Sequence, residues 1–184
     1  MMKLGIFNKK TKNTVIFLDI DGVLNTKSSW KTPFQLDNTC IKNFCESITN
    51  LKTPVKIILT SSWKNGFSSV PEYESPQLKN LRQKLQTFNI TISGRTKNLS
   101  NRMNEIDEYL KTHDVSTFAV IDDDKNEYSS EYLKKVTLID SNKGFLPQNG
   151  KKIKWNANQQ TMALAQHSQQ KNINAIHNDK SMEY

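Results

Sequence analysis

Residues 15–25 have the sequence VIFLDIDGVLN, and this stretch predicts both a fold class and a site. Its first four residues are apolar, which is typical of a strand that is buried on both faces in the middle of a parallel sheet. The strand runs into Asp19 and Asp21, and Gly22 then permits a turn. In open α/β sheets, ligands bind in the crevice outside the carboxyl ends of the strands. We therefore expect both carboxylates to project into such a crevice.

Asp19 and Asp21 carry like charges at close range, and something must offset their repulsion. A metal ion, a shared proton or a positive neighbour can do so. A divalent cation held by hard oxygen ligands is the first candidate, and Mg²⁺ is typical. An EF-hand calcium loop is excluded, because its glycine is the sixth residue of the loop and Gly22 follows the second acid directly. The plain alternative is a polar turn, since Asp and Gly are common turn residues.

Further apolar runs follow along the chain and alternate with helical segments. Apolar residues recur at helical spacing within residues 38–51, 76–88 and 101–110, which gives each segment one apolar face. This alternation of strand and helix favours an α/β fold with a doubly wound parallel sheet. The predicted strands cover residues 15–18, 55–59, 118–121 and 136–139, and a short strand is expected over residues 90–92 with a turn at Gly94.

Each of the four main predicted strands ends in polar residues. Thr60 and Ser61 follow the second strand, Asp122 and Asp123 follow the third, and Asp140 ends the fourth. Because the carboxyl ends of parallel strands lie along one edge of a sheet, we expect these groups to converge. Hydroxyl and backbone N–H groups at such an end are suited to hold a phosphate oxygen. Simple capping of the next segment by Ser or Thr is the alternative for the second strand.

A basic residue begins the helix predicted over residues 101–110. Ser100 or Asn101 caps this helix, and Arg102 lies in its first turn. A cation near a helix N-terminus is mildly unfavourable, so Arg102 indicates a bound anion. An exposed arginine without a role is the alternative.

The composition limits the classes of partner that the protein could bind. The chain has 184 residues, enough for one domain with a core, and a formal net charge of +8, which favours an anionic partner. Cys40 and Cys45 lie too far apart for a C-x-x-C pair, so we expect reduced thiols. The first residues contain too short an apolar piece for a signal peptide, and no run is long enough to span a membrane. We therefore expect a cytoplasmic protein.

The amino-acid composition changes at about residue 147 and becomes more polar and basic. We expect a domain over residues 1–146 and a polar, basic extension over residues 147–184, in which lysines flank Trp155 and Gln and Asn are frequent. A solvated tail is the favoured interpretation. A basic and aromatic contact to nucleic acid or to a partner protein is the alternative.

The order of these motifs resembles that of the haloacid dehalogenase (HAD) superfamily. The motifs are DIDGV at residues 19–23, Thr60-Ser61, a basic residue at a helix start, and Asp122-Asp123, each of the acidic and hydroxyl motifs following a strand. The finer pattern is similar to that of the phosphatase-like domain of Swiss Army Knife RNA repair proteins. It comprises LDIDGVLN at 18–25, SSWK at 61–64, R-x-x-E-I at 102–106, IDDD at 121–124 and the segment from Asp140 to Gly144.

The resemblance implies a Rossmann-like HAD core and a phosphatase mechanism. Asp19 would be the nucleophile that forms an aspartyl-phosphate, and Asp21 the general acid and base. Thr60 and the backbone of Ser61 would hold the phosphoryl group, and Arg102, with Lys97 as a rival, would neutralise its charge. Mg²⁺ would lie between Asp19, the backbone carbonyl of Asp21 and Asp123, with Asp122 assisting or shaping the loop.

The spacing of the motifs leaves little room for a cap domain. The segment between residues 25 and 55 is already occupied by a loop and one helix, and the segment between residues 61 and 102 by another helix and a short strand. An open site suits a polymer end better than a small metabolite that must be sealed from water, and the positive charge agrees with a nucleic acid. We expect a phosphomonoesterase of polynucleotide ends. A phosphatase of nucleotides or sugar phosphates, or a catalytically silent binding module, remain the alternatives.

Overall fold

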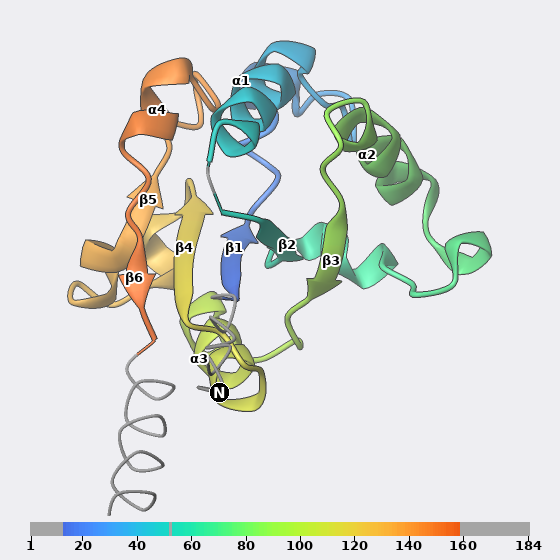
Figure 1. The fold of residues 1–184 in the computed structure, drawn as a ribbon. Coiled ribbons are helices and arrows are strands. Elements are labelled where there is room, and N and C mark those ends of the chain that lie inside the picture. Colours follow the sequence, from blue (N-terminus) through green and yellow to red (C-terminus); the bar gives the residue numbers. More distant parts are fainter. Residues whose placement is uncertain (1–12, 52, 159–184) are drawn as a thin grey trace, which may run out of the picture.

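A six-stranded sheet forms the centre of the protein. The computed structural model describes residues 13–51 and 53–158. Within them, five parallel strands are ordered β3-β2-β1-β4-β5, and β6 pairs antiparallel with β4 (Figure 1). The middle position of β1 agrees with its apolar sequence. The strands are β1 (Thr14–Leu18), β2 (Val55–Leu59), β3 (Ile92–Arg95), β4 (Thr117–Asp122), β5 (Val136–Leu138) and β6 (Asn156–Ala157).

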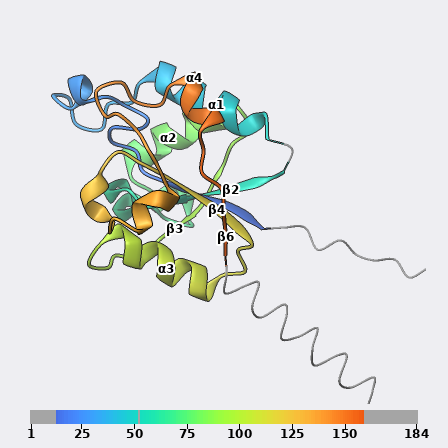
Figure 2. The ribbon, with the colours of Figure 1, turned by 90° about the vertical axis from the view of Figure 1, so that its left-hand side faces the viewer.

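Helices cover both faces of the sheet, which confirms the predicted doubly wound α/β fold. Three lie on one face and α3 lies on the other (Figure 2). The first group is α1 (Asn38–Thr49), α2 (Pro76–Gln86) and α4 (Pro147–Lys151), and α3 spans Arg102–Thr112. Short 3-10 turns occupy the loops: η1 (Lys27–Ser29), η2 (Ser62–Gly66), η3 (Pro71–Tyr73), η4 (Lys125–Glu127) and η5 (Tyr132–Lys135).

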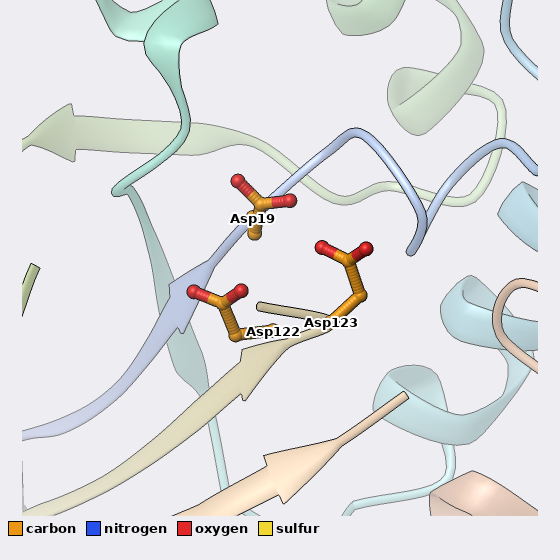
Figure 3. Close-up of side chains that lie close together, drawn as sticks. All are labelled: Asp19, Asp122 and Asp123. Atoms are coloured by element: carbon orange, nitrogen blue, oxygen red, sulfur yellow. The ribbon is translucent and has the colours of Figure 1, made fainter. Parts of the chain in front are cut away.

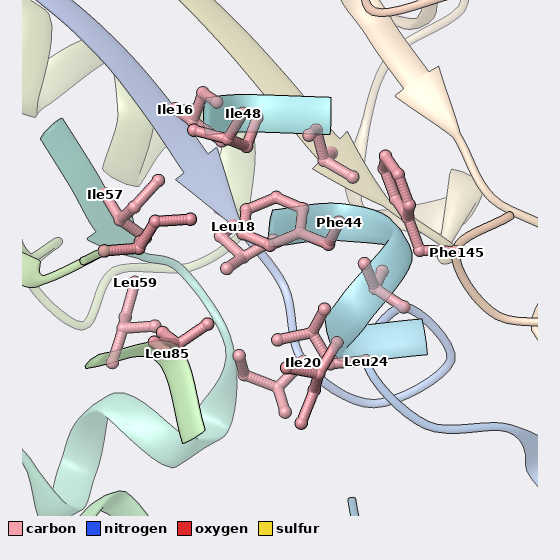
Figure 4. Close-up of a cluster of buried hydrophobic side chains, with 14 of the residues drawn as sticks. Ile16, Leu18, Ile20, Leu24, Phe44, Ile48, Ile57, Leu59, Leu85 and Phe145 are labelled. Atoms are coloured by element: carbon pink, nitrogen blue, oxygen red, sulfur yellow. The ribbon is translucent and has the colours of Figure 1, made fainter. Parts of the chain in front are cut away.

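Successive residues of β1 serve the two faces in turn, as the geometry of a strand requires. Ile16 and Leu18 pack in the cluster that contains Phe44 of α1 (Figure 4). Val15 and Phe17 pack in the opposite cluster, to which α3 contributes apolar residues. All four are buried, so β1 is covered on both sides. This parity also decides the side toward which residues beyond the strand project.

Side-chain caps fix the starts of two helices that matter for the site. Asp37 accepts hydrogen bonds from the backbone N–H groups of Thr39 and Cys40, and α1 begins after it. Asn101 accepts from the N–H of Asn104, so α3 begins at Arg102. Of the two caps predicted for α3, Asn101 and not Ser100 is the one used.

The third strand differs from its prediction. β3 covers Ile92–Arg95 instead of residues 90–92, and Gly94 lies inside the strand, paired with Ile58. The expected turn at Gly94 was therefore wrong. The parallel pairing with β2, in which Ile58 pairs with Gly94 and Leu59 with Arg95, outweighs the turn preference of glycine.

No cap domain interrupts the described residues. The segment after β1 holds η1 and α1, and the segment after β2 holds η2, η3 and α2. Residues beyond 146 add α4, which contacts α1, and β6, which pairs with β4. The rest of the predicted tail, residues 159–184, lies outside the described residues. Among the helices that are described, none has the length and apolar character needed to cross a bilayer.

A buried ion pair joins the loop after β2 to α3. Lys64 and Glu105 are both buried and form a salt bridge. Lys64 Nζ also donates to Thr96 Oγ1 at 3.3 Å, and Glu105 accepts from Thr96 Oγ1 at 2.9 Å and from the N–H of Leu99 at 3.2 Å. Lys64 Nζ also donates to the carbonyl oxygen of Thr60 at 3.5 Å, so the network supports the residue that follows β2.

We expect Lys64→Met to lower the free energy of unfolding by about 3 to 5 kcal/mol, because the carboxylate of Glu105 would remain buried without its cation. The double variant Lys64→Met/Glu105→Gln removes that charge and keeps an acceptor for Leu99. It should recover most of the loss in a chemical denaturation experiment. A double variant no more stable than Lys64→Met would show that the charge of Glu105 is not the cause.

Candidate active site

The strand registers place three polar residues side by side at the carboxyl edge of the sheet. Leu18 is paired with Leu59 of β2 and with Ile121 of β4. The next residue of each strand is therefore Thr60, Asp19 and Asp122, in that order across the sheet. Two hydrogen bonds extend the ladders to this row, from Asp19 N to Ile121 O and from Thr60 N to Leu18 O, both 3.0 Å.

Arg102 joins two carboxylates of this row. By the parity of their strands, Asp19 and Asp122 project toward the face that α3 covers, and Arg102 is the first residue of α3. Its Nη1 donates to both oxygens of Asp122, at 2.7 and 2.6 Å. Its Nη2 lies 3.0 Å from Asp19 Oδ1 in an ion pair. The rival Lys97 is mostly exposed and pairs with Glu108.

Asp123 completes a cluster of three carboxylates (Figure 3). One oxygen each of Asp19, Asp122 and Asp123 lies within 4.8 Å of the others, a spacing that one metal ion can span. Gly22 makes room for this approach. Its φ is +76°, and a Cβ there would lie 2.3 Å from Asp123 Oδ2. Only glycine allows the loop after β1 to pass so close to this carboxylate.

The protonation equilibria reflect the crowding of like charges. Burial raises the pKa of Asp19 well above its ordinary value, and the charge of Asp122 raises it further. The same two causes raise the pKa of Asp123 to about 6. Burial lowers the pKa of Arg102, but the charges of Asp19 and Asp122 outweigh burial and the net shift is upward. A cation at the cluster would offset the remaining negative charge, so the donor set fits a hard divalent metal ion.

Asp21 lies outside the cluster of three carboxylates and is held by two donors. Asn25 Nδ2 donates to its Oδ1 at 2.8 Å, and Trp63 Nε1 donates to its Oδ2 at 2.9 Å. The side chain of Asn25 is fixed in turn, since its Oδ1 accepts from the N–H of Gly22 at 2.8 Å and from Trp30 Nε1 at 3.1 Å. The structure thus orients the Asp21 carboxylate without bringing it into the group of Asp19, Asp122 and Asp123.

The two hydroxyl residues after β2 differ in their surroundings. Thr60 is buried, and its Oγ1 has no hydrogen-bond partner among the described residues. The hydroxyl of Ser61 accepts from the N–H of Trp63 at 3.4 Å and caps η2, as the capping alternative expected for this segment. Thr60 is therefore a hydroxyl with a free donor beside Asp19, whereas the side chain of Ser61 shapes the turn.

Tyr128 is a site residue that the sequence analysis did not identify. Its hydroxyl donates to Asp122 Oδ2 at 2.6 Å, and burial together with the charge of Asp122 raises its pKa. Glu127 accepts a hydrogen bond from the N–H of Arg102 at 3.0 Å. These contacts fix Asp122 and the start of α3. In the sequence, the only sign that Glu127 and Tyr128 belong to the site is that both follow the IDDD motif at 121–124 closely.

Asn25 and Trp63 belong to motifs of the sequence, but the sequence predicted no role for either residue. Asn25 follows Asp21 closely in the same motif, which is a signal for its role, whereas Trp63 is distant in sequence from the Asp21 carboxylate that it holds. A cleft of about 480 Å³ opens over Asp19, Asp21, Arg102 and Asp123. It is lined by Asp19, Asp21, Lys27, Trp30, Arg102, Asp123, Asp124, Lys125, Asn126 and Ser141.

We expect Asp123→Asn to stabilise the protein at neutral pH when divalent metal is removed with a chelator. The pKa of Asp123 is about 6 in the folded protein against an ordinary value of 3.8. Folding therefore takes up a proton between these values, so the free energy of unfolding falls as the pH rises through them. Asparagine removes this loss, which amounts to roughly 1 to 2 kcal/mol after allowance for solvent screening.

Thermal unfolding at pH 7 and at pH 4 measures this effect. The Tm of Asp123→Asn should exceed that of the wild type at pH 7, and the difference should shrink at pH 4. Asp114→Asn is the matched control, because Asp114 is exposed and outside the cluster. An Asp123→Asn variant that is less stable than the wild type at pH 7 would contradict the crowding of charge.

Comparison with known families agrees with this geometry. Residues 15–149 match the family model described as the HAD domain in Swiss Army Knife RNA repair proteins. The matched segment contains every residue of the site and most of the described fold. Comparisons with curated proteins and with solved structures found no match. The chain belongs to the family of HAD domains found in Swiss Army Knife RNA repair proteins.

Proposed function

We propose that this chain is a Mg²⁺-dependent phosphomonoesterase that acts on polynucleotide ends through an aspartyl-phosphate on Asp19. One observation carries the proposal. Thr60 Oγ1 is buried without a hydrogen-bond partner among the described residues, and the adjacent strand runs into Asp19, whose buried Oδ1 has the ion pair with Arg102 but no hydrogen bond. Buried polar atoms without partners are costly. They are expected where a ligand completes the site, and a phosphoryl group suits a nucleophilic carboxylate beside a hydroxyl donor.

In the first step, an oxygen of Asp19 attacks the phosphorus, and the bond between phosphorus and the leaving oxygen breaks. Asp21 donates its proton to that leaving oxygen, so the product departs as an alcohol. Thr60 Oγ1 and the backbone N–H of Ser61 donate to the phosphoryl oxygens. The guanidinium of Arg102 lies beside Asp19 and stabilises the charge of the transferring group.

In the second step, Asp21 removes a proton from water, and the oxygen of that water attacks the phosphorus of the aspartyl-phosphate. The bond between phosphorus and Asp19 breaks, which releases phosphate, restores the Asp19 carboxylate and leaves Asp21 protonated for the next cycle. The hydrogen bonds from Asn25 and Trp63 support this role, because they hold the Asp21 carboxylate in one orientation for both proton transfers.

The carboxylates of Asp19 and Asp123 would hold the Mg²⁺ ion together with the backbone carbonyl of Asp21. When bound, the ion supplies positive charge that lowers the repulsion between the carboxylates and the phosphoryl group. Asp122 has both oxygens engaged by Arg102 and Tyr128, which supports a role in positioning Arg102. We therefore assign Asp122 mainly to the arginine and Asp123 to the metal.

Three features support a polynucleotide end as the substrate. The family is named for RNA repair proteins. The cleft is open, with no cap domain inserted in the described residues. Lys27 and Lys125 line the cleft beside the acids, and the chain has a formal net charge of +8. Lysines bind a phosphate backbone without reading its sequence.

Substitution of the two catalytic carboxylates separates their roles. Asp19→Asn should abolish phosphate release, because it removes the nucleophile. Asp21→Asn should lower kcat by about 10² to 10⁴ with an alkyl phosphate. The loss should be smaller with p-nitrophenyl phosphate, whose leaving group departs without a proton.

Phosphate release with Mg²⁺ and with a chelator measures these effects, and Asp114→Asn serves as the matched control. If Asp19→Asn keeps the activity of the wild type, the nucleophile is misassigned. If Asp21→Asn slows both substrates equally, Asp21 is not the acid for the leaving oxygen.

The substrate class is tested with matched phosphates. Oligonucleotides that carry a 3′- or a 5′-phosphate should exceed the corresponding mononucleotides in kcat/KM, and the advantage should fall as salt rises, because the lysine contacts are electrostatic. A preference for mononucleotides at all salt concentrations would contradict the polymer substrate and favour a small-molecule phosphatase.

A further inference from the structure

An aromatic groove lies next to the acidic cleft. Residues 26–37 connect the site loop to α1, and side chains of this segment line a second hollow of about 330 Å³ together with Asp21 and Asn25. Asp21 and Trp30 line both this hollow and the acidic cleft, so the two spaces adjoin. The other residues that line the groove are Asn25, Thr32, Pro33 and Phe34.

Trp30 is exposed and yet held in place. Its side chain is 44% exposed, which is unusual for so large an apolar group. Its Nε1 donates to Asn25 Oδ1 at 3.1 Å, and Lys27 Nζ lies 5.8 Å from the centre of its ring. A fixed aromatic ring beside a lysine offers a surface for stacking together with a charge for a neighbouring phosphate.

Phe34 forms the other wall of the groove and is strained. Its φ is +58°, a conformation that bulky residues rarely adopt, and its side chain is 51% exposed. The ring packs edge-on against Trp63, with 5.3 Å between ring centres. Trp63 in turn donates to Asp21. Strain that places an exposed aromatic ring over the support of Asp21 favours a functional role over a packing role.

We propose that this groove binds the nucleobase of the nucleotide that carries the terminal phosphate, stacked against Trp30 and Phe34. This inference rests on the proposed function, in which Asp21 protonates the leaving oxygen. The leaving nucleoside must then lie on the Asp21 side of the site, where the groove opens. Stacking on aromatic rings tolerates every base, because every base has a π-face. The groove therefore gives affinity for a nucleotide end without a preference for sequence.

The test compares two oligonucleotides that differ only at the phosphorylated terminal nucleotide, which carries a base in one and is abasic in the other. The wild type should prefer the base-containing substrate in kcat/KM by about tenfold or more. Trp30→Ala and Phe34→Leu should reduce this ratio toward one, while Trp30→Phe should retain most of it. A purely structural effect through Asn25 would slow both substrates equally and leave the ratio unchanged.

Tyr73→Ala is the matched control, because Tyr73 is an aromatic residue that is 83% exposed and does not line either hollow. The same pair of oligonucleotides is also measured for equilibrium binding to the Asp19→Asn variant, and glycerol phosphate serves as a substrate without a ring.

The outcomes separate this inference from the proposed function. If the enzyme hydrolyses glycerol phosphate and the ratio of kcat/KM between the base-containing and the abasic substrate is near one, the groove does not bind the base, and the proposed phosphatase function still holds. A preference for the base in binding that depends on Trp30, without hydrolysis of any phosphomonoester, would support the groove and overturn the phosphatase. A ratio that survives both Trp30→Ala and Phe34→Leu would show that the base binds elsewhere.

Discussion

The repulsion among carboxylates at one edge of the sheet is the constraint on which the site depends. Asp19, Asp122 and Asp123 approach one another within 4.8 Å, and Arg102 is the cation that the structure places against two of them. Folding brings these charges together although it raises the pKa of Asp19 and of Asp123. Carboxylates whose pKa values are raised in this way are typical of functional sites.

The register of a parallel sheet makes it possible to predict from the sequence that these polar residues lie together. Four apolar runs followed by polar residues predicted the strands, and the carboxyl ends of parallel strands must lie at one edge. Thr60, Asp19 and Asp122 then fall in one row, because their strands pair in register. The predicted start of α3 added Arg102 to the same place. The backbone pattern thus contained the main part of the site before any side-chain contact was known.

Other parts depend on side-chain contacts that no periodicity reveals. Glycine is disfavoured in strands, so Gly94 predicted a turn, and the pairing of β3 with β2 overrides that preference. The support of Asp21 comes from Trp63, which is distant in the chain, and from Asn25, whose side chain links several segments. The loop of Trp30 and Phe34 has no regular sequence pattern. The hydrogen bond from Trp30 Nε1 to Asn25 links this loop to the site. Tertiary contacts of this kind decide orientation, whereas the pattern decides only proximity.

Chemical trapping of the intermediate tests the central claim most directly. The enzyme is quenched during turnover with Mg²⁺ and a phosphomonoester and is then reduced with borohydride, which converts an aspartyl-phosphate into homoserine. Mass spectrometry of the peptides locates the reduced residue. The proposed mechanism predicts homoserine at position 19 and only in samples that contained substrate. Turnover without any reduction at Asp19, or reduction at another carboxylate, would contradict it.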